Sequence, residues 1–240
     1  MSHDSLSPVY AQTMKAAEIS EIRRAISSPR ISTYDAAIPG DAASALALYT
    51  WNAQISAAFM LPLHFVEVLT RNAAAEGIET VYGARWPWSH GFEQSLQSPP
   101  PKSHSYNPRR DLTSTRSGRP TAGKVIPEVK FVFWQKMFTA RYDQRLWDQQ
   151  ILSLFPNASG SAPSDVRQKI YDHLEHIRNF RNRVAHHEPI FSRNLNDDLT
   201  AITDLISMRS PAAGTWLSDR ELVTGLLLER PIAGANHATA

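Results

Sequence analysis

The residues best suited to chemistry lie in one short run, RNFRNRVAHHEPI, at positions 178–190. Arginine offers a planar fork of donors to phosphate oxygens, and histidine can transfer a proton near neutral pH. Arg181, Asn182 and His186 bring a guanidinium, an amide and an imidazole into this run. Such a set suits phosphodiester chemistry, in which one group holds the scissile phosphate and another moves a proton.

Helical geometry decides which of these side chains can act together. Asn182 and His186 are four residues apart and share a helix face, whereas Arg181 lies about 140° around the helix from His186. Arg181 and His186 therefore converge only if the helix bends or ends near them. Pro189 favours an end, because proline disfavours helical backbone at the preceding residue. A plainer interpretation stays open, since cations at a helix C-terminus also complement the helix dipole.

Other reactive residue types give weaker indications. The chain has nine histidines and no cysteine, which excludes disulfides, thiolate metal sites and thiol nucleophiles. His173 and His176 lie three residues apart on one expected helix, but they lack the H-E-x-x-H spacing of a zinc site and a placed third ligand. No serine occupies a nucleophile-elbow setting, and the carboxylates are scattered along helix faces. We therefore expect neither a metal nor another cofactor.

The hydrophobic pattern predicts an all-α protein without repeats or alternating strands. Helices are expected over 10–26, 30–37, 42–82, 126–139, 164–188, 195–208 and 218–229. Asp41 and Ser164 are typical N-caps, Gly83 is a typical helix end, and Pro62 is expected to kink or break the longest helix. Four large aromatic residues are expected in the core rather than as base-stacking platforms: Trp51, Phe59, Phe133 and Trp134.

The composition is typical of a soluble globular protein, with 42% hydrophobic and 20% charged residues in 240. The net charge is only +2, so any affinity for nucleic acid must come from local patches. No segment reaches the roughly 18 uninterrupted apolar residues of a membrane span. The N-terminal residues lack the basic start and apolar block of a secretory signal. We expect a cytoplasmic protein without a membrane partner.

Residues 97–123 differ from the rest of the chain, because proline, serine, glycine and arginine dominate there. This composition predicts a flexible basic insertion. From Lys102 to Lys124 there are six lysines or arginines against one acid, Asp111. Such a segment is either a solvated loop or an electrostatic guide for a polyanion. In the second case four arginines would contact RNA phosphates: Arg109, Arg110, Arg116 and Arg119.

Three segments, in this order, resemble the Abi-like (abortive infection) branch of the HEPN-domain ribonuclease superfamily. They are LYTWNAQISAAFMLPLHFVEVLTRNA at 48–73, GKVIPEVKFVFW at 123–134 and RNRVAHHEPIF at 181–191. The last carries the R-x(4)-H signature of these ribonucleases, with a polar residue directly after the arginine. The resemblance spans about 40–210.

The resemblance implies a HEPN-like helical bundle made by the whole chain, 1–240, with added helices over 1–40 and after the motif helix, 164–188. Two protomers would place their motifs across a basic cleft and cut RNA without a metal. Arg181 would hold the scissile phosphate, His186 would transfer the proton for attack by the ribose 2′-hydroxyl, and Asn182 would orient one or both. The product would be a 2′,3′-cyclic phosphate. Further residues would line the cleft: Glu67, Arg71, Asn72, Arg178 and His187.

The resemblance also implies a role as a toxin in bacterial anti-phage defence, with an RNA or protein antitoxin as a partner. A second interpretation remains, in which the chain is an inactive HEPN module that binds RNA or a protein. Glu67 and Arg71 are four residues apart and can also form a simple intrahelical pair. Toxins of this superfamily that are controlled by tyrosine adenylylation carry Tyr two residues after the histidine, where this chain has Glu188.

Overall fold

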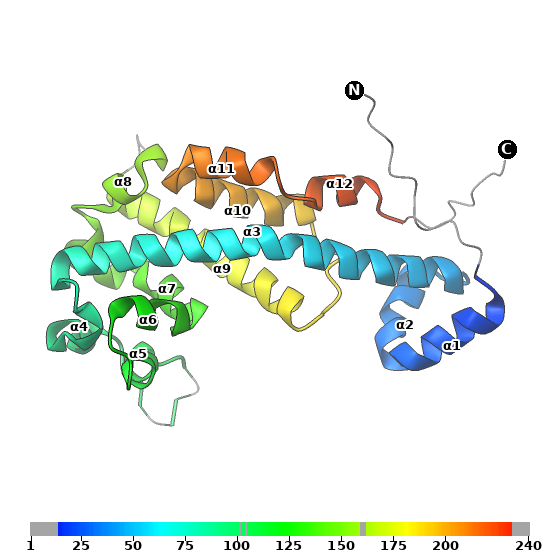
Figure 1. Cartoon of the computed structure of the whole chain (residues 1–240), viewed down its shortest axis with the longest axis horizontal. Coiled ribbons are helices and arrows are strands. Elements are labelled where there is room, and N and C mark those ends of the chain that lie inside the picture. Colours follow the sequence, from blue (N-terminus) through cyan, green and yellow to red (C-terminus); the bar gives the residue numbers. More distant parts are fainter. Residues whose placement is uncertain (1–13, 101, 104, 159–161, 232–240) are drawn as a thin grey trace.

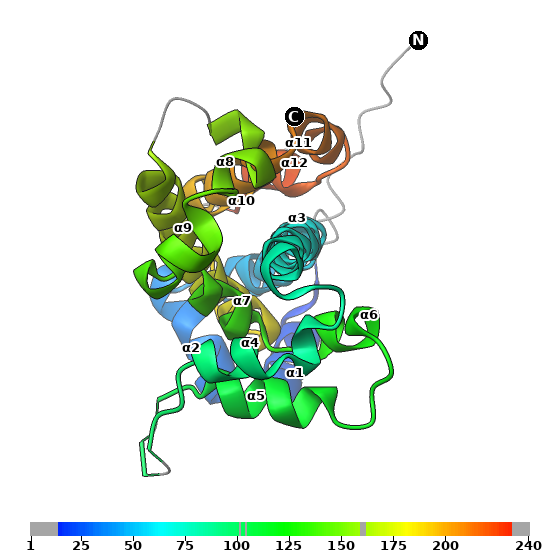
Figure 2. The same cartoon turned by 90° about the vertical axis from the view of Figure 1, so that its left-hand side faces the viewer.

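The computed structural model describes residues 14–100, 102–103, 105–158 and 162–231 of the chain. Every regular element within these ranges is helical, which confirms the prediction of an all-α protein. One long helix, α3 (Ala42–Tyr82), runs through most of the molecule, and the other helices pack along it (Figure 1). Viewed from its end in Figure 2, α3 lies between α10 (Leu195–Arg209) and α11 (Pro211–Ser218) on one side and α4 (His90–Ser95) to α7 (Phe131–Met137) on the other.

The remaining helices are α1 (Ala16–Ile26), α2 (Ser28–Ala37), α5 (Pro108–Arg116), α6 (Ala122–Val125), α8 (Ile151–Leu154), α9 (Pro163–Ala185) and α12 (Val223–Leu228). α1 and α2 pack against the first part of α3, and α9 packs against both α3 and α10. One hydrophobic cluster includes residues from α2 through α12, so these elements share a core. The four aromatic residues expected in this core are buried there, as predicted: Trp51, Phe59, Phe133 and Trp134.

The ends of α3 follow from two local signals. The side chain of Asp41 accepts a hydrogen bond from the backbone N–H of Ser44 at 2.9 Å, which confirms the predicted N-cap. Gly83 follows the last turn with a φ of +77°, a left-handed conformation that costs glycine little. Both predicted ends of this helix are therefore confirmed.

Pro62 does not break α3, so that part of the prediction is wrong. The helix continues through Pro62, which is itself buried against the core, and packing on both sides offsets the lost backbone hydrogen bond. Beyond the proline the buried positions are Leu63, Val66 and Thr70. The residues predicted for that face, Phe65, Val68 and Leu69, are only half-buried, because the helix keeps its phase from Phe59.

Several other predicted boundaries need correction. α9 begins at Pro163, one residue before the predicted start, and its N-cap is Ala162 instead of Ser164, because proline at the first helical position needs no N–H donor. The helix predicted over 126–139 is a 3-10 turn, Ile126–Glu128, followed by α7, since Val129 is extended. The last predicted helix, 218–229, is only α12, and α11 precedes it with Ser210 as a capping side chain. The first part of the helix predicted over 10–26 lies outside the described residues.

The prediction of a flexible insertion over 97–123 is wrong for α5 and for the start of α6. Asn107 caps α5 by accepting a hydrogen bond from Arg110 N–H at 2.9 Å, and Pro108 opens the helix. Arg116 then connects α5 to the 3-10 turn Trp86–Trp88 and to α4, since it donates to Pro87 O at 2.6 Å and to a Glu93 carboxylate oxygen at 2.5 Å. The segment has few apolar residues, and arginine side chains that donate to backbone carbonyl groups hold it in place instead. The composition of the segment does not reveal these hydrogen bonds.

By length and composition α3 could cross a membrane, with a mean hydropathy of 1.3 over its most apolar window. A share of 33% of that window is buried inside the molecule. Core helices of soluble proteins pass the same test. No second helix in the described part of the chain meets both criteria.

Gly77 is the glycine of α3, and the Trp147 ring packs directly against it. A Cβ atom added at Gly77 would lie 2.9 Å from Cζ3 of Trp147 and 3.2 Å from Cδ1 of Leu154. The Trp147 ring has little freedom to yield, since its Nε1 donates to Met137 O at 2.7 Å and its face stacks on Phe138 with centroids 4.6 Å apart.

We therefore expect Gly77→Ala to lower the free energy of unfolding by about 1–2 kcal/mol, because overpacking outweighs the gain of about 1 kcal/mol in helix propensity. Urea unfolding followed by circular dichroism measures this change. Gly225→Ala is the matched control, since an added Cβ there meets no atom within 4 Å. It should leave the stability unchanged or raise it, and a Gly77→Ala variant that gains as much would contradict the packing argument.

Candidate functional site

The chemistry-bearing run lies at the exposed C-terminal end of α9. Three backbone bonds close the helix: His186 N–H to Asn182 O at 2.9 Å, His187 N–H to Val184 O at 3.1 Å and Glu188 N–H to Arg183 O at 2.8 Å. This is the Schellman pattern, in which the residue after the cap is left-handed. His187 occupies that position with a φ of +56°. The helix therefore ends at Ala185, before Pro189 as predicted but three residues earlier than the predicted end at 188.

A buried side chain of α3 holds the segment that follows α9. Asn52 is only 4% exposed, and its Oδ1 accepts hydrogen bonds from the backbone N–H groups of Ile190 at 2.8 Å and Phe191 at 3.1 Å. Tyr34 of α2 packs on Phe191, with ring centroids 5.1 Å apart. These contacts fix the direction of the chain that leaves the motif.

Two arginines hold the same turn from outside. Arg30 of α2 donates to the backbone carbonyl of His187. Arg183 donates through Nη2 to Pro189 O at 3.0 Å, and its Nε lies 3.6 Å from a Glu188 carboxylate oxygen. The turn that carries His186 is thus tied to α2, to α3 and to its own helix, while the His186 side chain stays exposed.

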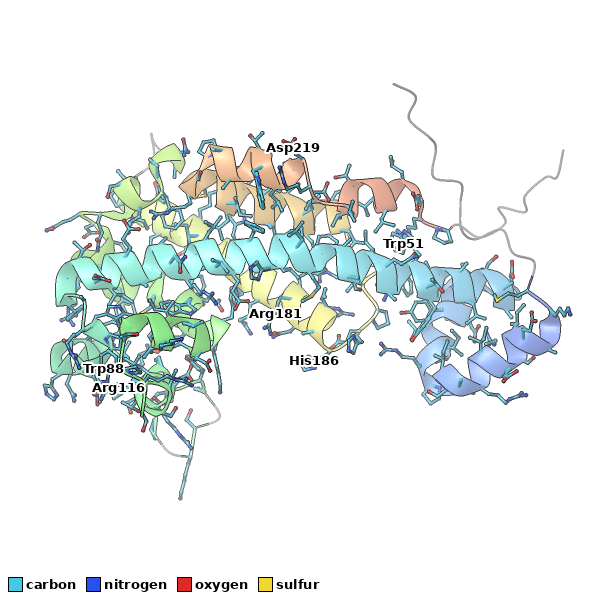
Figure 3. All side chains as sticks on the ribbon, in the orientation of Figure 1. Trp51, Trp88, Arg116, Arg181, His186 and Asp219 are labelled. Atoms are coloured by element: carbon cyan, nitrogen blue, oxygen red, sulfur yellow. The ribbon has the colours of Figure 1, made fainter. Side chains whose placement is uncertain are left out.

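Arg181 and His186 do not converge within one chain. α9 continues without a bend to Ala185, so the two side chains keep their separation of about 140° around the helix (Figure 3). The side chain of Arg181 is 44% exposed, and its Nε lies 3.9 Å from Oε2 of Glu67 on α3. The structure thus brings Glu67 and Arg181 together, and the intrahelical pair of Glu67 with Arg71 is absent from the ion pairs of the described residues.

The other residues predicted for the cleft lie in different surroundings. Arg178 donates through Nε to Oε1 of the buried Gln135 at 2.7 Å, which fixes it against α7. Arg71 is half-buried, and its Nε has no hydrogen-bond partner within the described residues. Asn72 is exposed. Asn182 is partly exposed and lies one turn before His186 on the same face of α9.

A buried carboxylate clamps α9 to α10 behind the motif. The Asp198 side chain is 0% exposed and accepts hydrogen bonds from Arg193 Nε at 2.9 Å and Nη2 at 2.6 Å. His176 Nε2 lies 2.7 Å from Asp198 Oδ1, an ion-pair approach without hydrogen-bond geometry. The Arg193 guanidinium also lies over the Phe180 ring, 5.3 Å from its centroid. His176 is therefore engaged in holding two helices together.

His173, the second histidine of this helix, has a different environment. Burial lowers the pKa of His173 below its ordinary value of 6.5, and the positive charge of Lys169 lowers it further. No group of three or more His, Asp or Glu side chains within the described ranges is arranged to hold a metal ion.

The lowered pKa of His173 predicts a loss of stability in acid. The unfolded chain binds the proton first, so the free energy of unfolding should fall as the pH drops below about 6.5 and go on falling until the folded form is protonated as well. His173→Gln should flatten this acid-side slope in urea unfolding between about pH 7.5 and about pH 5.5. The exposed His64→Gln serves as control. An unchanged slope in His173→Gln would show that the buried imidazole does not cause it.

The sequence analysis did not predict three residues that position the motif: Arg30, Asn52 and Arg183. One signal was present for Asn52, because it is a polar residue on the buried face defined by Leu48, Ile55 and Phe59. Arg30 and Arg183 gave none, since they resemble ordinary surface cations in the sequence.

Comparison with protein-family models, with curated proteins and with solved structures found no match for this chain.

Proposed function

We propose that this protein is a metal-independent endoribonuclease of the abortive-infection type, with a HEPN-like bundle and Arg181, Asn182 and His186 as its catalytic residues. The observation that carries the proposal is the end of α9, where the turn after an exposed R-x(4)-H run is held by an exposed hydrogen bond from α2 and by two buried hydrogen bonds from α3. A helix end that served only to terminate α9 would not need this support from two other helices.

The proposed reaction is transesterification within the RNA strand. His186 accepts the proton of the 2′-hydroxyl as the ribose 2′-oxygen forms a bond to phosphorus, and a proton is delivered to the 5′-oxygen as its bond to phosphorus breaks. The strand then ends in a 2′,3′-cyclic phosphate, and the leaving strand carries a 5′-hydroxyl. Arg181 stabilises the charge that develops on the non-bridging oxygens, because its planar fork matches their spacing. Asn182 orients the phosphate or the imidazole.

The divergence of Arg181 and His186 within one chain favours a composite site built by two protomers. Around a two-fold axis, the same surface of each protomer meets its copy. Arg181 of one protomer can then lie near His186 of the other, although the two side chains diverge within one chain. Glu67 and Arg71 of α3 border this surface and belong to the proposed cleft, with Asn72, Arg178 and His187.

We therefore expect a homodimer whose interface includes the 181–186 segment. Analytical ultracentrifugation of the wild type should give twice the mass of 26.9 kDa. A charge-reversing variant in this surface, Arg181→Glu, should shift the equilibrium toward the monomer, whereas Arg24→Glu on the exposed face of α1 should not. A monomer that cleaves RNA at the full rate would contradict the composite site.

A second candidate function is an inactive HEPN module that binds RNA or a protein. The proximity of Glu67 to Arg181 favours it, because a carboxylate 3.9 Å away weakens the attraction of the guanidinium for phosphate. Under either function the partner would include RNA or an antitoxin, and the protein would work in the cytoplasm.

Incubation with mixed cellular RNA in excess EDTA separates the two functions. The ribonuclease proposal predicts cleavage that chelation does not slow, with no cleavage of single-stranded DNA because DNA lacks the 2′-hydroxyl. Tight RNA binding without cleavage under any divalent-ion condition would support the binding module instead. Cleavage that stops on chelation would reject the metal-independent mechanism.

A further inference from the structure

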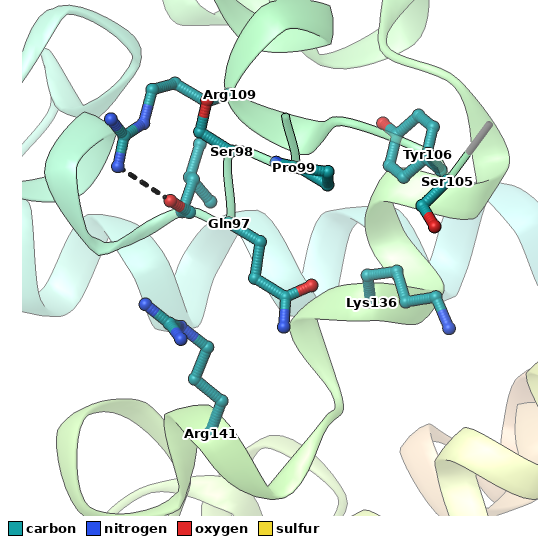
Figure 4. Close-up of a pocket in the computed structure, with 9 residues that line it drawn as sticks. Gln97, Ser98, Pro99, Ser105, Tyr106, Arg109, Lys136 and Arg141 are labelled. Atoms are coloured by element: carbon teal, nitrogen blue, oxygen red, sulfur yellow. Dashed lines mark hydrogen bonds between the residues drawn. The ribbon is translucent and has the colours of Figure 1, made fainter. Parts of the chain in front are cut away.

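A cavity of about 840 Å³ opens between the segment after α4, the start of α5 and the end of α7 (Figure 4). Three cationic side chains line it: Arg109, Lys136 and Arg141. None of its nine lining residues is acidic, and none belongs to the end of α9. The cavity is therefore a second positively charged feature, separate from the proposed catalytic residues.

The two arginines are anchored by part of their donors and keep others free. Arg141 donates through Nε to the backbone carbonyl of Ser95 at 3.1 Å. Arg109 donates through Nη2 to two backbone carbonyls, at 3.0 and 2.9 Å, and its buried Nε has no partner within the described residues. A guanidinium has five N–H donors, so each arginine retains donors for a ligand while its position is fixed.

Lys136 is fixed in a similar way, by a residue of α9. Its Nζ donates to the hydroxyl of Tyr171 at 3.0 Å and lies 5.3 Å from the centroid of that ring. An ammonium has three donors, and one hydrogen bond leaves two of them. Figure 4 shows the Gln97 side chain between those of Arg141 and Lys136.

Three like charges around one cavity without an acid repel one another, and a multiply charged anion relieves this repulsion. Phosphate oxygens suit this set, because both guanidinium and ammonium groups bind them with charge-assisted hydrogen bonds. The rest of the wall is partly apolar, with Pro99 and the ring of Tyr106. The Tyr106 hydroxyl donates to Asp111, which holds that ring in place.

We propose that this cavity binds a nucleotide. Arg109, Lys136 and Arg141 hold its phosphates, and its ring system lies against Pro99 and Tyr106. The volume lies within the range of roughly 300–1,000 Å³ that is usual for small-molecule sites. This inference does not depend on the proposed ribonuclease activity, since binding is measured without any cleavage.

Isothermal titration of the purified protein with ADP, GDP, CDP and UDP, at constant ionic strength, tests the proposal. At least one of these should bind, and the corresponding nucleoside without phosphates should not. Lys136→Gln and Arg141→Gln should each weaken that binding by about tenfold or more, because each removes a charge-assisted contact. Arg110→Gln is the matched control, since Arg110 is an exposed cation of the same helix, α5, that does not line the cavity.

The melting temperature of each unliganded variant shows whether it has folded, and either of the two glutamine variants alone is a sufficient test. Binding of none of the four diphosphates would overturn the proposal, as would equal binding by Lys136→Gln, Arg141→Gln and the wild type. Pyrophosphate that binds as tightly as the best diphosphate would overturn the assignment to a nucleotide. Binding of single-stranded RNA alone, weakened by the same two variants, would replace the nucleotide with an RNA strand.

Discussion

Arg181→Ala and His186→Ala should each lower the rate of RNA cleavage by about 10²- to 10⁴-fold, the range expected for loss of a general acid–base or of phosphate stabilisation. Both side chains are exposed, so neither substitution creates a cavity. The unfolding midpoint in urea should therefore change little. A loss of activity with retained stability would place both residues in the reaction rather than in the fold.

The neighbouring histidine provides the matched control for this pair. His187→Gly removes an imidazole next to His186 and gives the left-handed position the residue that best tolerates it. We expect this variant to keep most of the activity, because His187 borders the proposed cleft but has no role in the proposed reaction. If it loses as much activity as His186→Ala while Arg181→Ala remains active, the assignment of roles within the run is wrong.

Asn52→Leu should have the largest effect on stability among substitutions of polar residues in α3. Leucine fills a similar volume but leaves the buried N–H groups of Ile190 and Phe191 without their acceptor. Each buried donor without a partner costs about 1–3 kcal/mol, so the free energy of unfolding should fall by about 2–5 kcal/mol. Urea unfolding measures the fall.

Hydrogen exchange locates the damage. The amide protons of Ile190 and Phe191 should exchange faster in Asn52→Leu, since their hydrogen bonds are lost. Thr50→Val is the control, because Thr50 is exposed on the same turn of α3 and its hydroxyl bonds only within its own helix, to Leu46 O. It should change the stability by less than about 0.5 kcal/mol. An equally small change in Asn52→Leu would show that Asn52 does not hold the segment.

The sequence predicted the helical class, the long helix and, to within three residues, the end of the motif helix, because these depend on local signals. Asp41, Gly83 and Pro189 act within a turn of their own positions, and the apolar period of α3 and α9 is visible in the letters alone. The continuation of α3 through Pro62 was not predictable in this way. It depends on packing from helices distant in the sequence, which offsets a local penalty.

The basic segment, 97–123, shows that composition alone can wrongly predict a loop. Arg109 and Arg116 suggested a solvated loop, yet both donate to carbonyl groups of residues 87–96 and hold α5 in place. Hydrogen bonds between distant positions leave no periodic trace in a sequence. For the same reason the pattern showed Arg181 and His186 but not Arg30, whose contact with the turn of His187 spans most of the chain.

The chemical state of the RNA ends tests the central proposal most directly. Mixed RNA would be incubated with wild type and with His186→Ala in excess EDTA, and the new 3′ ends would be examined for a 2′,3′-cyclic phosphate. We expect cyclic-phosphate ends from the wild type, each paired with a 5′-hydroxyl, and almost none from His186→Ala. Ends with a 3′-hydroxyl and a 5′-phosphate, or equal cleavage by both proteins, would contradict the proposal that His186 moves the proton in a metal-independent transesterification.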